Sequence, residues 1–113
     1  SLVVTGASPD GADIDLQWDA FGCPSLDYNL VYGDLHQVPT DSLAGAECAI
    51  GVSGGYLWTG VPSADLFFLM VGTDETGVYE SSWGTGTDGA ERGQTGASFL
   101  CGATTKIVTS SCP

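Results

Sequence analysis

The sequence predicts an all-β fold, a two-sheet antiparallel β-sandwich. Three observations lead to this fold class. Short runs of alternating apolar and polar residues recur at intervals of about ten to fifteen residues. The composition favours turns, with 17 glycines, and only two residues are lysine or arginine. No long window spaces its apolar residues as an amphipathic helix would. At 113 residues the chain has the size of one domain.

The first three predicted strands cover residues 1–7, 13–20 and 28–35. The first reads as an edge strand and is followed by a turn at Pro9–Gly11, where glycine can take a positive φ. Alternation in the next two strands predicts two inward-facing sets of side chains. These sets are Ile14, Leu16 and Trp18 in the second strand, and Tyr28, Leu30 and Tyr32 in the third.

The pattern then breaks before it resumes. Asp41 or Ser42 can cap one short helical turn that runs through Ala46. A fourth strand is expected at 55–62, after two glycines.

Residues 65–75 form the most hydrophobic predicted strand. It is apolar on both faces, so we expect it to lie centrally in a sheet. A strand over 78–93 is expected to fray into a glycine-rich loop, and 97–113 to hold one or two short strands around a turn at Gly102. About seven strands without helices make a sandwich.

The four cysteines predict two disulfides and therefore an oxidising compartment. They form an even set in a short chain, without a C-x-x-C pair or zinc-ligand spacing. Three pairings are open. We favour Cys23 with Cys48 and Cys101 with Cys112, because each bond closes a loop-rich segment.

The charge balance excludes some partners. Fourteen acidic residues face only Lys106 and Arg92, giving a formal net charge of −12. Nucleic acids and anionic membranes are poor partners for such a surface, and no apolar run reaches membrane-spanning length. We expect the Arg92 guanidinium to pair with a carboxylate and hold its loop against the sheet.

The sequence offers little for catalysis. His36 is the only histidine and is expected to lie in a loop after the third strand. A catalytic triad would need it beside a nucleophile and an orienting carboxylate. We expect neither an enzyme nor a bound cofactor.

Calcium is the one cofactor that the acidic loops suggest, because hard cations prefer oxygen ligands. Asp-Gly pairs are also common turn formers, which is the simpler interpretation. Three loops qualify, the third being preferred: Asp10, Asp13 and Asp15; Asp74 and Glu75; and Asp88 and Glu91.

The aromatic residues divide between core and surface. Trp18 and Trp58 are expected to pack inside the sandwich. Tyr79 and Trp83 lie four residues apart and so face the same side of a strand. We single them out as a candidate binding surface, with Trp83 the aromatic residue expected to be exposed.

The motifs "LQWD", "DYNLVYGDL" and "LFFLMVGTDETGVYESSWGTGTDGAER" carry a family resemblance over residues 1–93. Together they resemble the fibronectin type III-like, or immunoglobulin-like, module of secreted bacterial multidomain or surface proteins. The resemblance implies a spacer, adhesion or carbohydrate-associated module without catalytic residues. Residues 94–113 are then a disulfide-stapled C-terminal extension packed on the same domain.

We therefore expect a non-enzymatic structural or adhesion module at the cell surface or outside the cell. Its partners would be other domains of the same precursor, cell-surface molecules or further copies of itself. Two alternatives stay open: a subunit of a self-assembling extracellular filament or pilus, built through the exposed strand Leu2–Thr5, and a carbohydrate- or calcium-binding module.

Overall fold

The computed structural model describes residues 2–19, 21, 25–36, 43–63, 65–74, 76–84, 89–93 and 96–107. These residues form strands and turns without an α-helix, which confirms the predicted all-β class. No helix in these ranges is long and apolar enough to span a membrane.

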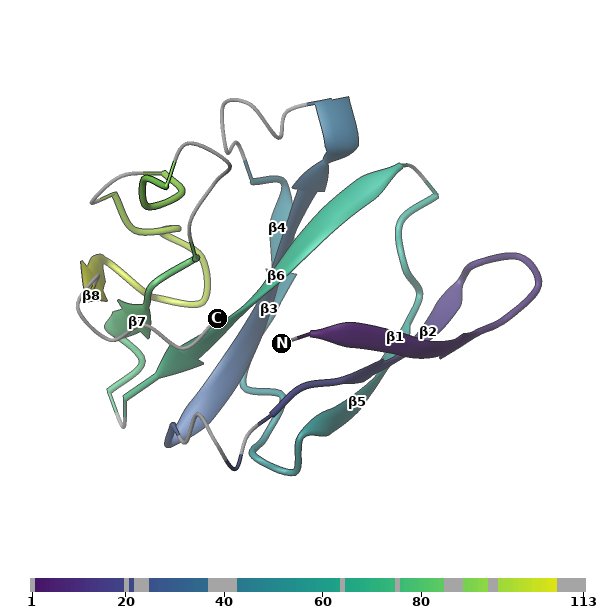
Figure 1. The fold of residues 1–113 in the computed structure, drawn as a ribbon, viewed down its shortest axis with the longest axis horizontal. Coiled ribbons are helices and arrows are strands. Elements are labelled where there is room, and N and C mark those ends of the chain that lie inside the picture. The colour runs from purple at the N-terminus through teal and green to yellow at the C-terminus, as the bar shows by residue number, and fades with distance from the viewer. Residues whose placement is uncertain are drawn as a thin grey trace.

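Eight strands form two sheets (Figure 1). The three-stranded sheet has the order β1-β2-β5 and the five-stranded sheet the order β4-β3-β6-β7-β8. The strands are β1 (Val3–Ala7), β2 (Asp13–Gln17), β3 (Asp27–Asp34), β4 (Gly45–Glu47), β5 (Gly55–Thr59), β6 (Leu66–Thr73), β7 (Tyr79–Ser81) and β8 (Thr105–Ile107).

The two sheets pack through a main core. Leu16 from β2 and Trp58 from β5 meet Leu30 from β3, and all three are fully buried. Tyr32 and Phe68 extend this core with rings 5.1 and 6.1 Å from the ring of Trp58. The predicted inward face of β2 and the core position of Trp58 are confirmed.

Trp18, which was expected inside the sandwich, comes directly after β2. It is half-buried, and its ring meets that of Tyr28 edge to face at 5.4 Å. Its indole nitrogen is buried, and none of the described residues accepts a hydrogen bond from it.

A second core covers the opposite face of the five-stranded sheet. Side chains alternate between the faces of a strand, so Val31 and Val71 point away from the main core. They pack with Trp83 and Leu100, which come from the C-terminal third of the chain. Strands β3 and β6 are therefore apolar on both faces because each face meets a separate core, and the predicted central position of β6 is confirmed.

Two predictions about this sheet are wrong. Residues 45–47 form strand β4 rather than the end of a helical turn, because Val31 and Tyr32 offer backbone pairing partners that local propensity does not reveal. The prediction for Asp41 and Ser42 lies outside the described residues. The sheets are also not wholly antiparallel, since β7 and β8 pair in parallel from Tyr79↔Thr105 to Ser81↔Ile107. The long connection between these two strands permits parallel pairing.

Candidate functional site

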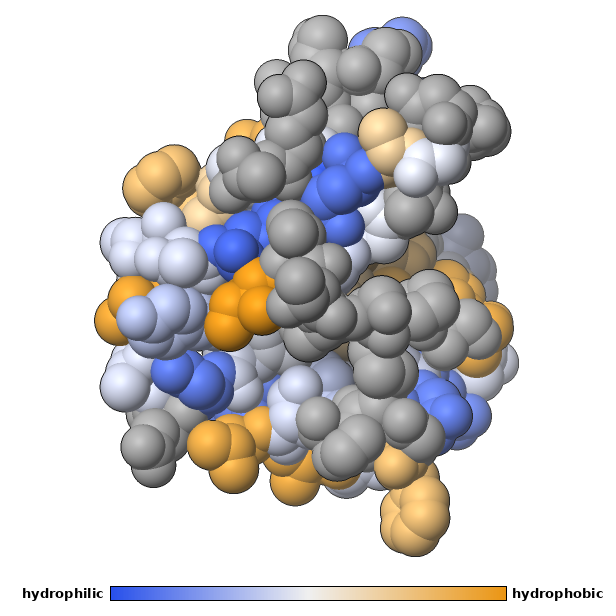
Figure 2. Space-filling view, turned by 60° about the vertical axis from the view of Figure 1, so that its left-hand side comes forward, coloured by the Kyte–Doolittle hydropathy of each residue, from blue (hydrophilic) through white to orange (hydrophobic). Residues whose placement is uncertain are grey.

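The candidate surface at Tyr79 and Trp83 does not form. Tyr79 is 42% exposed, whereas Trp83 is only 8% exposed and belongs to the second core. The prediction that Trp83 is exposed is therefore wrong. Figure 2 shows the side of the molecule that carries β7 and β8, where hydrophobic residues appear as separate small patches between hydrophilic ones.

Trp83 is instead the centre of a buried polar network, which we call the carboxylate–lysine cluster: Glu80, Glu91 and Lys106 around the indole of Trp83. The Lys106 Nζ lies 3.6 Å from the centre of the Trp83 ring. The Trp83 Nε1 donates to Glu80 Oε1 at 3.2 Å, and its backbone N–H donates to Glu91 Oε2 at 2.8 Å. Cation–π attraction and hydrogen bonds to charged groups strengthen in such a buried setting.

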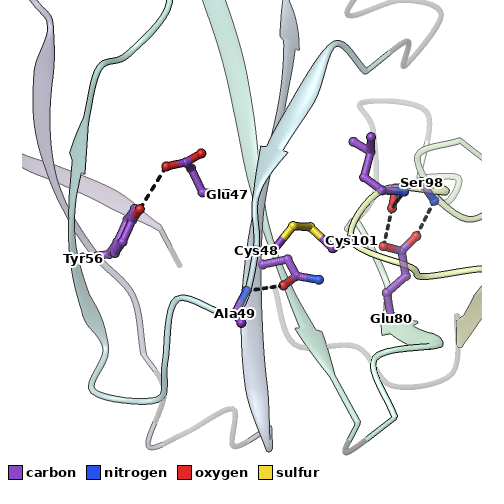
Figure 3. Close-up of a disulfide and its surroundings, with 9 residues drawn as sticks. Glu47, Cys48, Ala49, Tyr56, Glu80, Ser98 and Cys101 are labelled. Carbon is purple, nitrogen blue, oxygen red and sulfur yellow. Dashed lines mark hydrogen bonds between the residues drawn. A yellow bond between two sulfur atoms is a disulfide. The ribbon is translucent and has the colours of Figure 1, made fainter.

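Glu80 connects β7 to the C-terminal segment. The residue is 1% exposed, so its carboxylate needs donors to offset the loss of hydration. Ser98 supplies two: its hydroxyl donates to Oε2 at 2.8 Å and its backbone N–H donates to Oε1 (Figure 3). This carboxylate thereby fixes the position of residues near 98 on the sheet.

Glu91 and Lys106 form a buried ion pair. The Lys106 Nζ lies 3.3 Å from Glu91 Oε2 and donates to the Arg92 carbonyl at 2.6 Å. The Lys106 side chain is fully buried and that of Glu91 is 18% exposed. The Ser82 hydroxyl donates to the other oxygen of Glu91. The sequence predicted this role for the Arg92 guanidinium, which stays a prediction, whereas the role of Lys106 was not predicted. The missed signal was a lone lysine inside a short strand of a very acidic chain.

The disulfide joins Cys48, directly after β4, to Cys101 in the C-terminal segment. This bond contradicts the favoured pairing of Cys23 with Cys48 and of Cys101 with Cys112. The reason is that β4 and residues near 101 meet on the same face of the five-stranded sheet, where Ala46 and Leu100 both pack on the second core. Cys23 and Cys112 lie outside the described residues; if the chain forms two disulfides, they are the pair that remains.

The disulfide spans 53 residues and is surrounded by constrained backbone. Chain-entropy estimates assign a loop of this length about 4 kcal/mol of stabilisation. Ala49, Phe99 and Cys101 are the non-glycine residues with positive φ among those described, and all three lie at this crosslink. The backbone N–H of Ala49 donates to the Asn29 side chain at 2.8 Å, which holds its unusual conformation (Figure 3).

A polar contact links the opposite side of β4 to the three-stranded sheet. The Tyr56 hydroxyl on β5 donates to Glu47 Oε1 at 3.0 Å (Figure 3). Burial, and secondly this hydrogen bond to a carboxylate, raise the pKa of Tyr56 above its usual value of 10.0.

His36 lies at the surface, at the end of β3. Its side chain is 80% exposed, and its Nδ1 lies 2.9 Å from Asp34 Oδ1. The backbone N–H of His36 is the main reason that the pKa of Asp34 lies below 3.8. The surroundings of His36 are those of an exposed loop residue.

The acidic loops that suggested calcium differ in what their carboxylates contact. Asp10 accepts from Ser8 and Ala12, and Asp74 accepts from Thr76 and Gly77, as turn-forming aspartates do. Glu91 belongs to the carboxylate–lysine cluster. In the part of the chain that the structure describes, no three His, Cys, Asp or Glu residues gather as a metal site would require. Glu75 and Asp88 lie outside that part.

A groove of about 900 Å³ opens at the end of the sandwich where β5 ends and β6 begins. It was not anticipated from the sequence, because its walls come from three separate segments, residues 10–14, 35 and 58–68. The large apolar side chains of the lining are those of Ile14, Leu35, Trp58, Val61, Leu66 and Phe68. Asp10 and Asp65 are exposed and lie on the rim.

A second groove, of about 470 Å³, lies near the end of β2 and is lined by Trp18, Phe21 and Val52 among others. Phe21 is 99% exposed.

No protein-family model, curated protein or solved structure matches this chain.

Proposed function

We propose that this chain is a non-enzymatic structural and adhesive module of an exported protein. The observation that carries the proposal is the Cys48–Cys101 disulfide, which joins two parts of the fold across 53 residues. Structural disulfides persist in oxidising compartments such as the cell exterior. A small domain outside the cell gains stability from such a bond, because the burial of apolar side chains in two small cores contributes only a limited free energy of folding.

The strand order supports a fibronectin type III-like topology within this proposal. The first, second and fifth strands share one sheet, and the third, sixth and seventh share the other. Sandwiches of the immunoglobulin class divide the corresponding strands in this way. Strand β8 adds an edge strand to the five-stranded sheet, and Leu100 packs on the second core. Both contacts are in keeping with a C-terminal extension that packs on the same domain.

The buried charges have roles that suit a load-resistant module. Glu80 on β7 accepts hydrogen bonds from Ser98, and Glu91 accepts one from Trp83 just after β7. Lys106 links β8 to the backbone at Arg92. These contacts connect strands that the disulfide does not reach.

Localisation and redox state together test the proposal. Antibody labelling of intact cells that produce the protein should detect it at the surface or in the medium. Thiol labelling of the isolated protein should leave Cys48 and Cys101 unmodified. Protein confined to the cytosol with both thiols free would contradict the proposal, as would a hydrolase activity that His36→Ala abolishes.

A second candidate function, a filament subunit, is favoured by the exposure of β1. All five of its residues are exposed, including Val3 and Val4 at 50% each, and β1 stands at one end of its sheet with β5 at the other. Pairing of β1 from one copy with β5 of the next would extend without closing.

Like-charge repulsion opposes this assembly, since each copy carries a formal charge of −12. Fibres are therefore expected in electron micrographs only at high ionic strength, and Val4→Lys should prevent them because a charge blocks edge pairing. Monomers by light scattering in 1 M salt would exclude this candidate.

A further inference from the structure

We infer that the groove between the ends of β5 and β6 binds a partner segment whose apolar side chains are flanked by lysine or arginine. The inference deepens the proposed adhesive function by stating the chemistry of its partner. It rests on the shape of the groove, its apolar lining and its acidic rim.

The groove has the size and lining of a binding site. Its volume of about 900 Å³ lies within the range common for ligand sites, roughly 300 to 1,000 Å³. Trp58 is buried at its base, and Phe68 and Leu66 are half-buried beside it. Leu35 is 51% exposed on the wall, so an apolar side chain placed there would remove leucine surface from water.

The charges at the rim select a cationic neighbour. Asp65 is exposed and lies directly before β6. Asp10 is exposed too and carries a negative charge at neutral pH, since hydrogen bonds from the Ser8 hydroxyl and the Ala12 backbone N–H hold its pKa below 3.8.

A second copy of this chain does not fit that description. Its cations are Lys106 and Arg92 only, and Lys106 is fully buried against Glu91. Two copies would bring acidic surfaces together, which lowers both the affinity and the rate of encounter. The complementary partner is therefore a different chain that supplies positive charge around an apolar centre.

Peptide titration followed by NMR tests the inference on the intact chain. The probe is the capped peptide Lys-Leu-Phe-Leu-Lys, compared with Glu-Leu-Phe-Leu-Glu and Lys-Ser-Asn-Ser-Lys. The lysine–apolar probe should shift the amide signals of residues 58–66 and bind at least tenfold more tightly than either comparison peptide. Raising the salt concentration from 20 to 500 mM should weaken its binding severalfold.

Two matched pairs of variants separate the groove from general charge attraction. Leu35→Gln should weaken probe binding about tenfold, whereas Leu57→Gln, at a leucine that is 57% exposed but outside the groove, should not change it. Asp65→Lys should weaken binding about tenfold, and Asp15→Lys, on an exposed β2 position outside the groove lining, by less than threefold.

Three results would overturn the inference: equal binding of the glutamate peptide, equal losses in the two members of either variant pair, or no shift at millimolar probe. The test uses purified protein and does not depend on where the protein resides. Its failure would therefore leave the proposed surface role standing, and failure of the localisation experiment would leave the groove result standing.

Discussion

Glu47 and Cys48 are adjacent in the chain and join the five-stranded sheet to two different parts of the molecule. Glu47 accepts a hydrogen bond from Tyr56 on the three-stranded sheet, and Cys48 is bonded to Cys101 in the C-terminal segment (Figure 3). Glu47 is the last residue of β4 and Cys48 follows it directly, so the two connections start from neighbouring positions at one end of this short strand.

The Tyr56–Glu47 contact predicts a loss of stability at alkaline pH. The pKa of Tyr56 is raised in the folded state, so folding favours its protonated form. This contribution is present below the unfolded pKa of 10.0 and disappears as pH rises through the folded value. The melting temperature should therefore fall between pH 9 and pH 11, and fall less in Tyr56→Phe. If the melting temperatures of the natural chain and of Tyr56→Phe fell equally over this pH range, Tyr56 would not be the source of the loss.

Removal of Lys106 tests the buried ion pair. Lys106→Met leaves the Glu91 carboxylate without its cation in a mostly buried position. Breaking such a pair from one side costs about 3 kcal/mol or more, which urea unfolding would measure. The double variant Lys106→Met with Glu91→Gln removes the unpaired charge and should recover part of the loss. A loss below about 1 kcal/mol in the single variant would show that the pair is not buried in solution.

Gly93 predicts a packing constraint against Trp83. It has a φ of +65°, and a Cβ at this position would lie 2.9 Å from Trp83 Cε3 and closer still to Cζ3. Gly89 has a similar φ of +79° but open space around it. Both alanine variants bear the same backbone strain, so Gly93→Ala should be the less stable by about 1 to 3 kcal/mol in urea unfolding. Equal stabilities would mean that Trp83 does not pack on Gly93.

Asp74 predicts acid sensitivity. The Thr76 hydroxyl, followed by backbone N–H groups, lowers its folded pKa below 3.8. Its contribution is therefore present above that value and is lost as pH falls through the folded pKa. Between pH 5 and pH 2.5 the melting temperature of Asp74→Asn should fall less than that of the natural chain. An identical fall would assign the acid sensitivity to other carboxylates.

The sequence predicts those parts of the fold that local pattern determines. Alternation in β2 placed Leu16 inside, and the continuous apolar run of β6 placed it centrally. Such patterns reflect burial directly, because a strand reads polar on a wet face and apolar on a covered one.

Long-range contacts were less predictable. Cys48 pairs with Cys101 across 53 residues because the C-terminal segment returns over the sheet. The spacing of cysteines in a sequence does not reveal how the chain folds back, so it could not predict this pairing. Trp83 lies next to a glycine-rich loop in the sequence, which suggested that its side chain is exposed. Lys106 and Leu100, which are distant in the sequence, pack on it and bury it. The groove at Leu35 and Asp65 also depends on segments brought together only by folding.

Disulfide mapping tests the central claim most directly, namely that the C-terminal segment is bonded to the end of β4. The chain has only two tryptic sites, after Arg92 and Lys106, so digestion of the denatured, unreduced protein yields peptides 1–92, 93–106 and 107–113. The structure predicts that 1–92 stays linked to 93–106. A second cleavage before aspartates, which separates Cys23 from Cys48, should leave the Cys48 peptide joined to the Cys101 peptide. Linkage of 93–106 to 107–113 alone, with Cys23 bonded to Cys48, would contradict the account.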